Sequence, residues 1–162
     1  MTVTVEETRT RFNDGRRIVL DENERLLNSV DSVQWDRTGE LITSARSVFV
    51  IGNGRSGLAI QMAAMRLMHL GLRVHVAGEV TAPAVGSGDV LIAVSGSGTT
   101  ASVIGAADTA RKVGASVVAV TTAAESPLAQ RADEILVLPA ADKQDTAPPS
   151  PRSTRAACSS SP

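Results

Sequence analysis

Two stretches of the sequence decide the fold, 48-VFVIGNGRSGLAI-60 and 90-VLIAVSGSGTTASV-103. Each begins with a short run of apolar residues, which is typical of a β-strand covered on both faces of a sheet. Each run leads into a turn rich in glycine and hydroxyl side chains, and the turn leads into a segment with helical periodicity. The order strand, glycine turn, helix predicts parallel strands joined by right-handed helical crossovers.

The surrounding sequence extends this order. We expect helices over residues 58–70 and 100–113, each closed by a glycine, and a shorter helix around 126–132. Further strands are expected over residues 73–77, 116–120 and 134–138. These elements predict an α/β fold, a three-layer α-β-α sandwich with an open, mainly parallel sheet of the flavodoxin or Rossmann type. Such sheets bind ligands at the carboxyl ends of their strands, where both glycine turns lie.

The two ends of the chain differ from this middle region. Residues 1–17 are polar, and we expect a loose arm there. Residues 18–45 carry apolar residues near helical spacing, which predicts two N-terminal helices with a break near residues 35–39. The domain should then run over residues 18–140. Residues 141–162 are rich in Pro, Ser and Ala and lack periodicity, which predicts a disordered tail.

The composition of the chain argues against several classes of function. The 162 residues have a net charge of −1, and 43% of them are hydrophobic, which suits one domain with an aliphatic core. The basic residues are scattered, which argues against a nucleic-acid partner. The single cysteine, Cys158, has no metal-ligand spacing around it, so we expect no metal and no internal disulfide. We also expect no signal peptide and no membrane span, and therefore a cytoplasmic protein.

The second turn, 95-SGSGTT-100, has four hydroxyl side chains and two glycines in six residues. A turn that opens a helix presents backbone N–H groups without partners at the positive end of the helix dipole, and phosphate fits such a place. One hydroxyl would suffice to cap a helix, so this density favours a terminal phosphate over a simple cap. The predicted phosphate cradle consists of Ser95, Gly96, Ser97, Gly98, Thr99 and Thr100.

The first turn, 52-GNGRSG-57, matches the dinucleotide fingerprint G-x-G-x-x-G, and Glu79 stands at the end of the next strand, as a ribose-binding acid would. Dinucleotide binding is therefore one interpretation. Arg55 and Ser56 instead place a cation and a hydroxyl inside the turn, which suits a terminal phosphate or sugar hydroxyls. We predict that Gly54, Arg55 and Ser56 form the sugar side of the same pocket.

Other polar residues have two interpretations each. His69 lies three residues from Arg66 on one face of an apolar helix, so it either packs in a core or interface or belongs to the site. Glu79 is either a site residue or a surface residue, and His75 should pack within its strand. Three hydroxyl residues at the end of another strand either rim the pocket or cap a helix: Thr121, Thr122 and Ser126.

Several stretches resemble the sugar isomerase (SIS) domain family, and within it the hexuloisomerases. They are GNGRSG (52–57), AMRLMHLG (64–71), VAGEVTAP (76–83), VSGSGTTASV (94–103) and, more weakly, AESPLAQRAD (124–133). The resemblance runs over about residues 19–143. The second and third stretches are typical of hexuloisomerases, whereas the SGSG turn marks the wider family.

The resemblance implies conversion of D-arabino-3-hexulose 6-phosphate to fructose 6-phosphate through an enediol. This is the second step of formaldehyde fixation by the ribulose monophosphate pathway, and 3-hexulose-6-phosphate synthase is the pathway neighbour. It also implies no cofactor and a homodimer or homotetramer whose sites use neighbouring chains. By this resemblance Ser56, Ser95, Ser97 and Thr100 would hold phosphate, while Arg55, His69 and Glu79 would lie near the sugar. His69 and Glu79 are the candidates for the base.

The family also includes sugar-phosphate sensors in regulators, usually beside a DNA-binding domain. No helix-turn-helix is recognisable in the N-terminal part of this sequence, which favours the enzyme, although the sensor remains an alternative.

The sequence departs from the family after the last expected strand. Members continue with a segment like QYAGSLFEQ and a long apolar helix, and the glutamate of this segment is the family's favoured candidate for the base. Residues 152–161 read RSTRAACSSS instead. In GC-rich codons AQYAGSLFEQ is GCG CAG TAC GCG GGC AGC CTG TTC GAG CAG. Reading one base later gives CGC AGT ACG CGG GCA GCC TGT TCG AGC, which encodes RSTRAACSS.

We therefore hypothesise a frameshift around codons 140–152, so that the family's C-terminal glutamate and helix are lost from this reading frame. Loss of a core helix exposes apolar surface. We expect a poorly stable chain with little or no isomerase activity.

Overall fold

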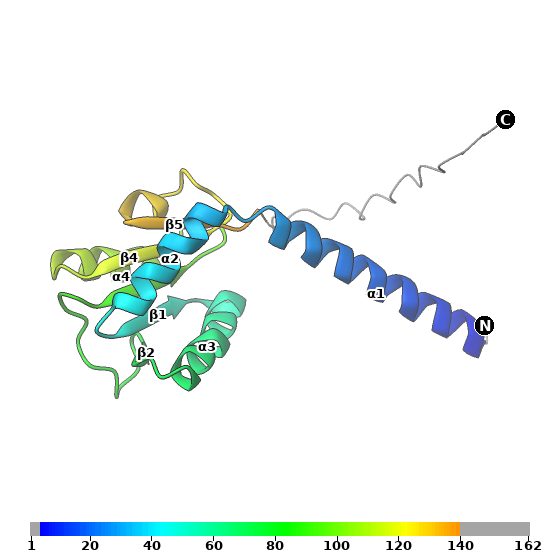
Figure 1. Cartoon of the computed structure of the whole chain (residues 1–162), viewed down its shortest axis with the longest axis horizontal. Helices are drawn as coiled ribbons and strands as arrows, with labels where there is room; N and C mark the ends of the chain where they lie inside the picture. The colour runs from blue at the N-terminus through cyan, green and yellow to red at the C-terminus, as the bar shows by residue number, and fades with distance from the viewer. Residues whose placement is uncertain (1–3, 140–162) are drawn as a thin grey trace. The chain divides into compact units, whose positions relative to one another are not determined.

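The computed structural model describes residues 4–139 (Figure 1). These residues divide into two compact units, one ending at Glu22 and one beginning at Asn23. Residues 140–162, which carry the expected tail and the hypothesised frameshift, lie outside the described residues, as do residues 1–3. No helix in the described part is both long and apolar enough to cross a membrane.

Helix α1 spans Val5–Asn28. The expected loose arm over residues 1–17 was therefore wrong for residues 5–17, which are helical. Apolar residues are sparse there, but Arg and Glu have good intrinsic helix propensity. Local contacts add to it, since Arg9 pairs with Glu6 at 3.2 Å and the Thr10 hydroxyl donates to the Glu6 carbonyl. A helix supported in this way does not need the apolar stripe by which helices are recognised in a sequence.

Helix α2 spans Ser32–Ser44, so the two N-terminal helices break at residues 29–31 and not near residues 35–39. Asp31 marks the start of α2, because its Oδ1 accepts hydrogen bonds from the amides of Val33 at 2.8 Å and Gln34 at 3.1 Å. Such a cap contributes about 1 kcal/mol. The glycine at position 39 costs a helix about the same amount, too little to end it.

The five strands of residues 4–139 lie in one parallel sheet, in the order β2-β1-β3-β4-β5. The strands are β1 (Val48–Gly52), β2 (Val74–Val76), β3 (Val90–Val94), β4 (Ser116–Thr121) and β5 (Glu134–Val137). Each agrees with its expected range to within one residue at either end. The chain runs from β1 outward to β2 and then back past β1 to β3, so the strand order reverses between β1 and β3.

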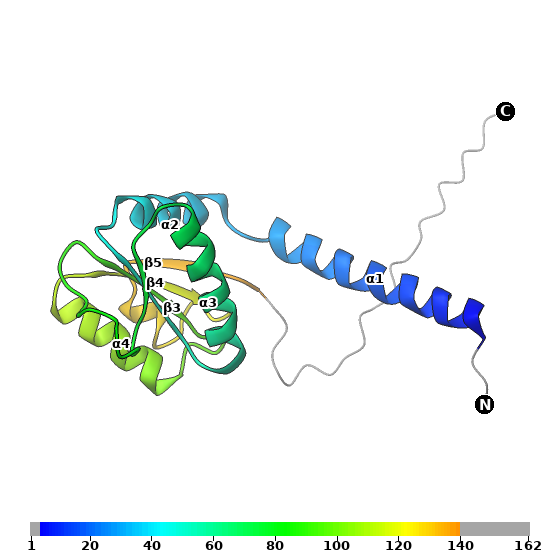
Figure 2. The ribbon, with the colours of Figure 1, turned by 90° about the horizontal axis from the view of Figure 1, so that it is seen from below.

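Helices cover both faces of the sheet, as predicted. Helix α3 (Gly54–His69) and α2 lie on one face, and α4 (Ala101–Lys112) lies on the other with the 3-10 turn Ala129–Arg131 (Figures 1 and 2). The helix expected over residues 126–132 is only this turn. The core on the α3 side includes Val50, Ala64 and Ile92, and the core on the α4 side includes Leu91, Val103 and Val117.

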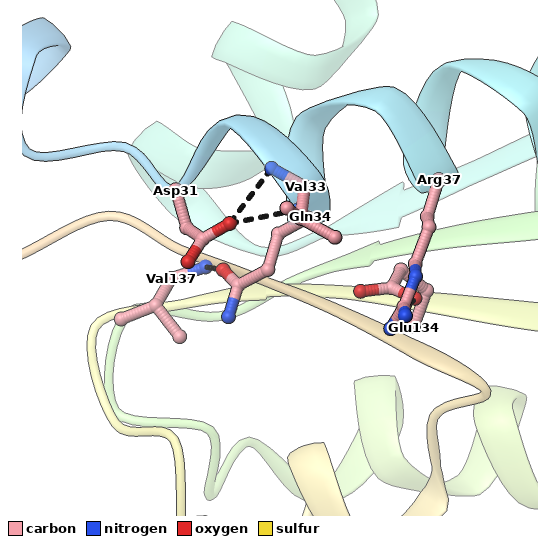
Figure 3. A network of polar contacts seen from close by, with 6 residues as sticks. All are labelled: Asp31, Val33, Gln34, Arg37, Glu134 and Val137. Atoms are coloured by element: carbon pink, nitrogen blue, oxygen red, sulfur yellow. Dashed lines mark hydrogen bonds and ion pairs between the residues drawn. The ribbon is translucent and has the colours of Figure 1, made fainter.

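Polar contacts connect α2 with the edge strand β5 (Figure 3). The Val137 amide donates to Gln34 Oε1 at 3.2 Å, and Arg37 lies 4.0 Å from the Glu134 carboxylate. An edge strand leaves outward amides without a strand partner. Gln34 supplies an acceptor for one of them, which holds α2 over this end of the sheet.

Candidate functional site

The two glycine-rich turns lie side by side at the carboxyl edge of the sheet. Strands β1 and β3 are direct neighbours, and their last residues, Gly52 and Val94, are paired in register. After β1 the chain enters α3 on one face of the sheet, and after β3 it enters α4 on the other face (Figure 2). A reversal of strand order of this kind forms the crevice in which doubly wound sheets bind their ligands.

The first turn is shorter than the sequence indicated. Residues 54–57 were expected in a loop, but they form the first turn of α3. Gly57 makes this possible, because a Cβ there would lie only 2.6 Å from the Gly52 carbonyl oxygen. Arg55 is therefore an exposed side chain and Ser56 a half-buried one in the first turn of a helix, at its positive end.

A side-chain hydrogen bond links the two turns. Asn53 precedes α3 but does not cap it; its Nδ2 donates instead to Ser102 Oγ, in the first turn of α4, at 2.8 Å. The sequence contains no signal for this contact, because the two residues lie 49 positions apart and meet only through the strand order.

The second turn contains two contacts between hydroxyl groups, one part-buried and one exposed. The Gly98 amide donates to the Ser95 carbonyl at 3.0 Å, which closes a four-residue turn. Ser95 is only 4% exposed, and its hydroxyl lies 2.9 Å from that of Thr100, immediately before α4. The exposed hydroxyls of Ser97 and Thr99 lie 2.9 Å apart.

The amides of this turn are the strongest feature of the site. In the described part of the chain, the amides of Gly96, Ser97 and Thr100 donate to no protein acceptor. The first amides of α4 follow directly, and the first turn of a helix leaves its N–H groups without helical partners. Unpaired amides, hydroxyls and the helix dipole are the features that an anion site requires, and residues 95–100 stay the predicted phosphate cradle.

Glu79 lies at the same edge of the sheet, since it follows β2, and its side chain is exposed. His69 does not lie there. It belongs to the last turn of α3, and sixteen helical residues place it roughly 22 Å from Gly54, near the opposite edge of the sheet. Within one chain the structure therefore brings Arg55, Ser56 and Glu79 to the edge that carries the cradle, but not His69.

A cavity of about 390 Å³ lies between α3 and β2. Its lining includes Gln61, Met65, Met68 and Glu79 but no residue of either turn. The unpaired amides thus lie at the predicted cradle and not in this cavity. His75 also lines the cavity and packs against Phe49, with ring centroids 5.2 Å apart, which agrees with its expected packing role.

Thr121 and Thr122 are placed differently from either expectation. Both hydroxyls donate to the carbonyl oxygen of Gly96, in the cradle. The Ser126 hydroxyl accepts from the Ala129 amide, so it does cap a turn. The sequence showed that these hydroxyls stand at a strand end, but not which group they contact.

The opposite, N-terminal edge of the sheet carries a structural ion pair. Asp89 is buried, and Arg46 donates two hydrogen bonds to its carboxylate, at 2.9 and 3.0 Å. These bonds hold the pKa of Asp89 below its usual value, although burial acts in the other direction. Among the described residues, no group of three or more His, Cys, Asp or Glu is placed to hold a metal ion.

Comparison with known proteins supports the fold. The SIS domain model matches residues 41–159. A 3-hexulose-6-phosphate isomerase of Mycobacterium gastri is 50% identical over 128 residues, which cover 79% of this chain and 64% of that protein. The chain thus spans a little under two thirds of that relative's length.

Two solved structures are also similar. A hypothetical protein of Methanococcus jannaschii, whose crystal structure infers a 3-hexulose-6-phosphate isomerase function, is 33% identical with a TM-score of 0.64. The match covers 68% of this chain and 62% of that one. NanR of Vibrio vulnificus, complexed with ManNAc-6P, is 27% identical with a TM-score of 0.68, over 78% of this chain and 50% of NanR. The parallel sheet, the two turns and these matches agree, and the chain belongs to the SIS domain family.

Proposed function

We propose that the chain is the sugar-phosphate-binding core of an isomerase that converts D-arabino-3-hexulose 6-phosphate to fructose 6-phosphate. The observation that carries the proposal is the cradle at residues 95–100, whose unpaired amides and hydroxyls suit a phosphate. The similarity to the Mycobacterium gastri isomerase supports the choice of this phosphate ester over others.

The cradle would act as an anchor. Phosphate bound to residues 95–100 supplies binding energy far from the reacting carbons, and this energy orients C2 and C3 at the carboxyl edge of the sheet. A base then takes the proton from C2, and the C–H electrons form the C2–C3 double bond of an enediol while the C3 carbonyl oxygen takes up a proton. A proton then returns to C3 as the C2 hydroxyl loses its proton and becomes the C2 carbonyl. The reaction is an internal redox change, so no external oxidant or reductant is required.

Glu79 is a carboxylate that this chain brings to the same edge, which makes it a base candidate within one chain. Arg55, in the first turn of α3, would attract the anionic substrate and stabilise negative charge on the enediol. His69 would act from a neighbouring chain of a homodimer or homotetramer. Its exposure, and the exposed Leu58, Met62 and Met65 on the same helix, support such an association.

The pathway context follows from the same reaction. A 3-hexulose phosphate is the product expected of 3-hexulose-6-phosphate synthase, so the isomerase would act directly after it in the ribulose monophosphate pathway. We expect both proteins in the cytoplasm.

The direct test is an assay that follows fructose 6-phosphate formed from the 3-hexulose phosphate. The assay compares the chain with a version in which the reading frame around codons 140–152 is restored. We expect turnover by the restored version, with little or none by the chain as written. Absence of turnover by both proteins, each shown to be folded, would contradict the proposal.

A non-catalytic sugar-phosphate sensor is the second candidate, favoured by the similarity to NanR with its bound ManNAc-6P. Binding of fructose 6-phosphate without turnover by the restored version would identify a sensor. Dinucleotide binding is a third interpretation, and a thermal shift with NAD but none with fructose 6-phosphate would favour it.

A further inference from the structure

Three donors converge on one backbone oxygen of the cradle. The Gly96 carbonyl accepts from the Thr122 amide at 3.0 Å, the Thr122 hydroxyl at 2.8 Å and the Thr121 hydroxyl at 3.0 Å. Thr121 is the last residue of β4 and only 2% exposed, whereas Thr122 follows it and is exposed. A carbonyl oxygen has two lone pairs, so three donors exceed what ordinary pairing requires.

This oxygen belongs to a peptide whose rotation the turn itself does not fix. The Gly96–Ser97 peptide is the central peptide of the turn closed by the bond from the Gly98 amide to the Ser95 carbonyl. The orientation of the central peptide is what distinguishes type I from type II turns. Gly96 has no Cβ to restrict its backbone. The rotation of this peptide must therefore be held by contacts from outside the turn.

Contacts that fix the Gly96 carbonyl oxygen also fix the direction of the Ser97 N–H. Peptide bonds in the described residues are trans, and in a trans peptide the C=O and the N–H point in opposite directions. Contacts that hold the Gly96 oxygen at the end of β4 therefore turn the Ser97 N–H away from β4. This N–H donates to no acceptor in the described residues. Donors on the carbonyl also polarise the peptide and make its N–H a stronger donor.

We propose that Thr121 and Thr122 are positioning residues, which hold the Gly96–Ser97 peptide so that the Ser97 amide donates to a phosphate oxygen of the substrate. The inference rests on the proposed function, because it requires phosphate in the cradle. According to this inference, residues at the end of β4 orient the Ser97 amide, which lies in the turn after the neighbouring strand β3. Neither threonine needs to touch the substrate.

Thr122 provides the cleaner test of the pair. The Thr121 hydroxyl also accepts from the Ala123 amide at 3.2 Å and is buried, so its removal would loosen the end of β4 as well. The Thr122 side chain is exposed, and its hydroxyl contacts the Gly96 carbonyl. Thr122→Val removes the hydroxyl at nearly constant volume, and Thr122→Ser retains it. Thr109→Val is a matched control, since the Thr109 hydroxyl bonds only within α4, to the Gly105 carbonyl.

The experiment is a titration of ¹⁵N-labelled full chain with inorganic phosphate, and then with fructose 6-phosphate, followed by the amide signals of residues 95–102. In the unaltered chain we expect a large phosphate-dependent shift of the Ser97 amide. Thr122→Val should lower the affinity for both ligands by about three- to tenfold, which is the effect expected when one hydrogen bond is lost. Thr122→Ser should restore affinity to within about twofold, and Thr109→Val should leave it unchanged.

Five results would overturn the inference. If the unaltered chain binds neither ligand, the proposed function fails and the inference with it. If that chain binds but Thr122→Val binds equally well, or the Ser97 amide does not shift, only the inference fails. Loss of affinity in Thr122→Val that Thr122→Ser does not restore indicates a packing role. An equal loss in Thr109→Val indicates general destabilisation.

Discussion

At the scale of single residues, the cradle depends on one backbone conformation that few residues adopt. Gly98 has a φ of +63°, and a Cβ at this position would collide with the side chain of the buried Ser126. The Leu128 amide also donates to the Gly98 carbonyl at 3.0 Å. Gly98 therefore holds the turn against the segment that follows β4.

Gly98→Ala should destabilise the folded chain, because the added Cβ is strained by the positive φ and must displace Ser126. We expect a loss of roughly 2–4 kcal/mol from the two effects together, seen as a lower midpoint of urea unfolding. Gly96→Ala is the matched control, since a Cβ there meets nothing within 4 Å and φ is not positive. Equal midpoints for the two variants would contradict this account of Gly98.

Asp89 predicts the pH dependence of stability. Its pKa is lowered in the folded chain, chiefly by the hydrogen bonds from Arg46, so folding favours the ionised carboxylate. This contribution is fully present above the unfolded pKa of about 3.9 and is lost as the pH falls through the lower folded value.

Urea unfolding at pH 7, 4 and 3 measures this effect. The unaltered chain should lose more stability across this range than Asp89→Asn, which cannot be protonated. The same loss in both proteins would show that other carboxyl groups cause the acid sensitivity.

At the scale of elements, the site depends on how two helices begin. Helices α3 and α4 cover opposite faces of the sheet, yet their first turns meet at its carboxyl edge through Asn53 and Ser102 (Figure 2). Asn53 contributes no cap to α3, so its side chain serves the contact between the two turns.

Asn53→Ala should therefore weaken fructose 6-phosphate binding by about threefold while changing the unfolding free energy by less than about 1 kcal/mol, since one partly exposed hydrogen bond is lost. Calorimetric titration of Asn53→Ala, Ser102→Ala and the double variant measures the effect. The double variant should bind no worse than either single variant, because both substitutions remove the same bond. Strictly additive losses would show that the two residues act separately.

At the scale of the whole molecule, the direction of α3 separates His69 from the cradle of its own chain. A role for His69 near the sugar therefore requires a second chain. This predicts complementation between two defective variants, His69→Ala and Ser97→Ala, in the frame-restored protein.

Each variant alone should show little activity, since every site lacks one group. Dissociating, mixing and reassociating the two should restore part of the activity, because some sites then combine an intact cradle with an intact His69. Sedimentation of the mixture checks that chains have exchanged. Exchange without any gain in turnover would exclude His69 from the neighbouring site.

The hypothesised frameshift around codons 140–152 is tested on the gene itself. Resequencing the gene there should show a one-base change, with codons for a segment like SLFEQ in another frame. An intact frame without such codons would refute the hypothesis, and residues 152–161 would then be a genuine departure from the family.

The sequence by itself determined the sheet and its parallel connections, and it placed the residues of the predicted cradle in one turn. These features depend on neighbours along the chain: apolar runs such as 90–94 form covered strands, and residues 95–100 carry their glycines and hydroxyls in one uninterrupted turn. The helical arm and the break before Asp31 were missed, because exposed helices and caps depend on local hydrogen bonds more than on apolar periodicity. Strand order and register bring together residues far apart in sequence. Only the tertiary structure could therefore show that Asn53 joins Ser102 and that Thr121 and Thr122 hold the Gly96 carbonyl.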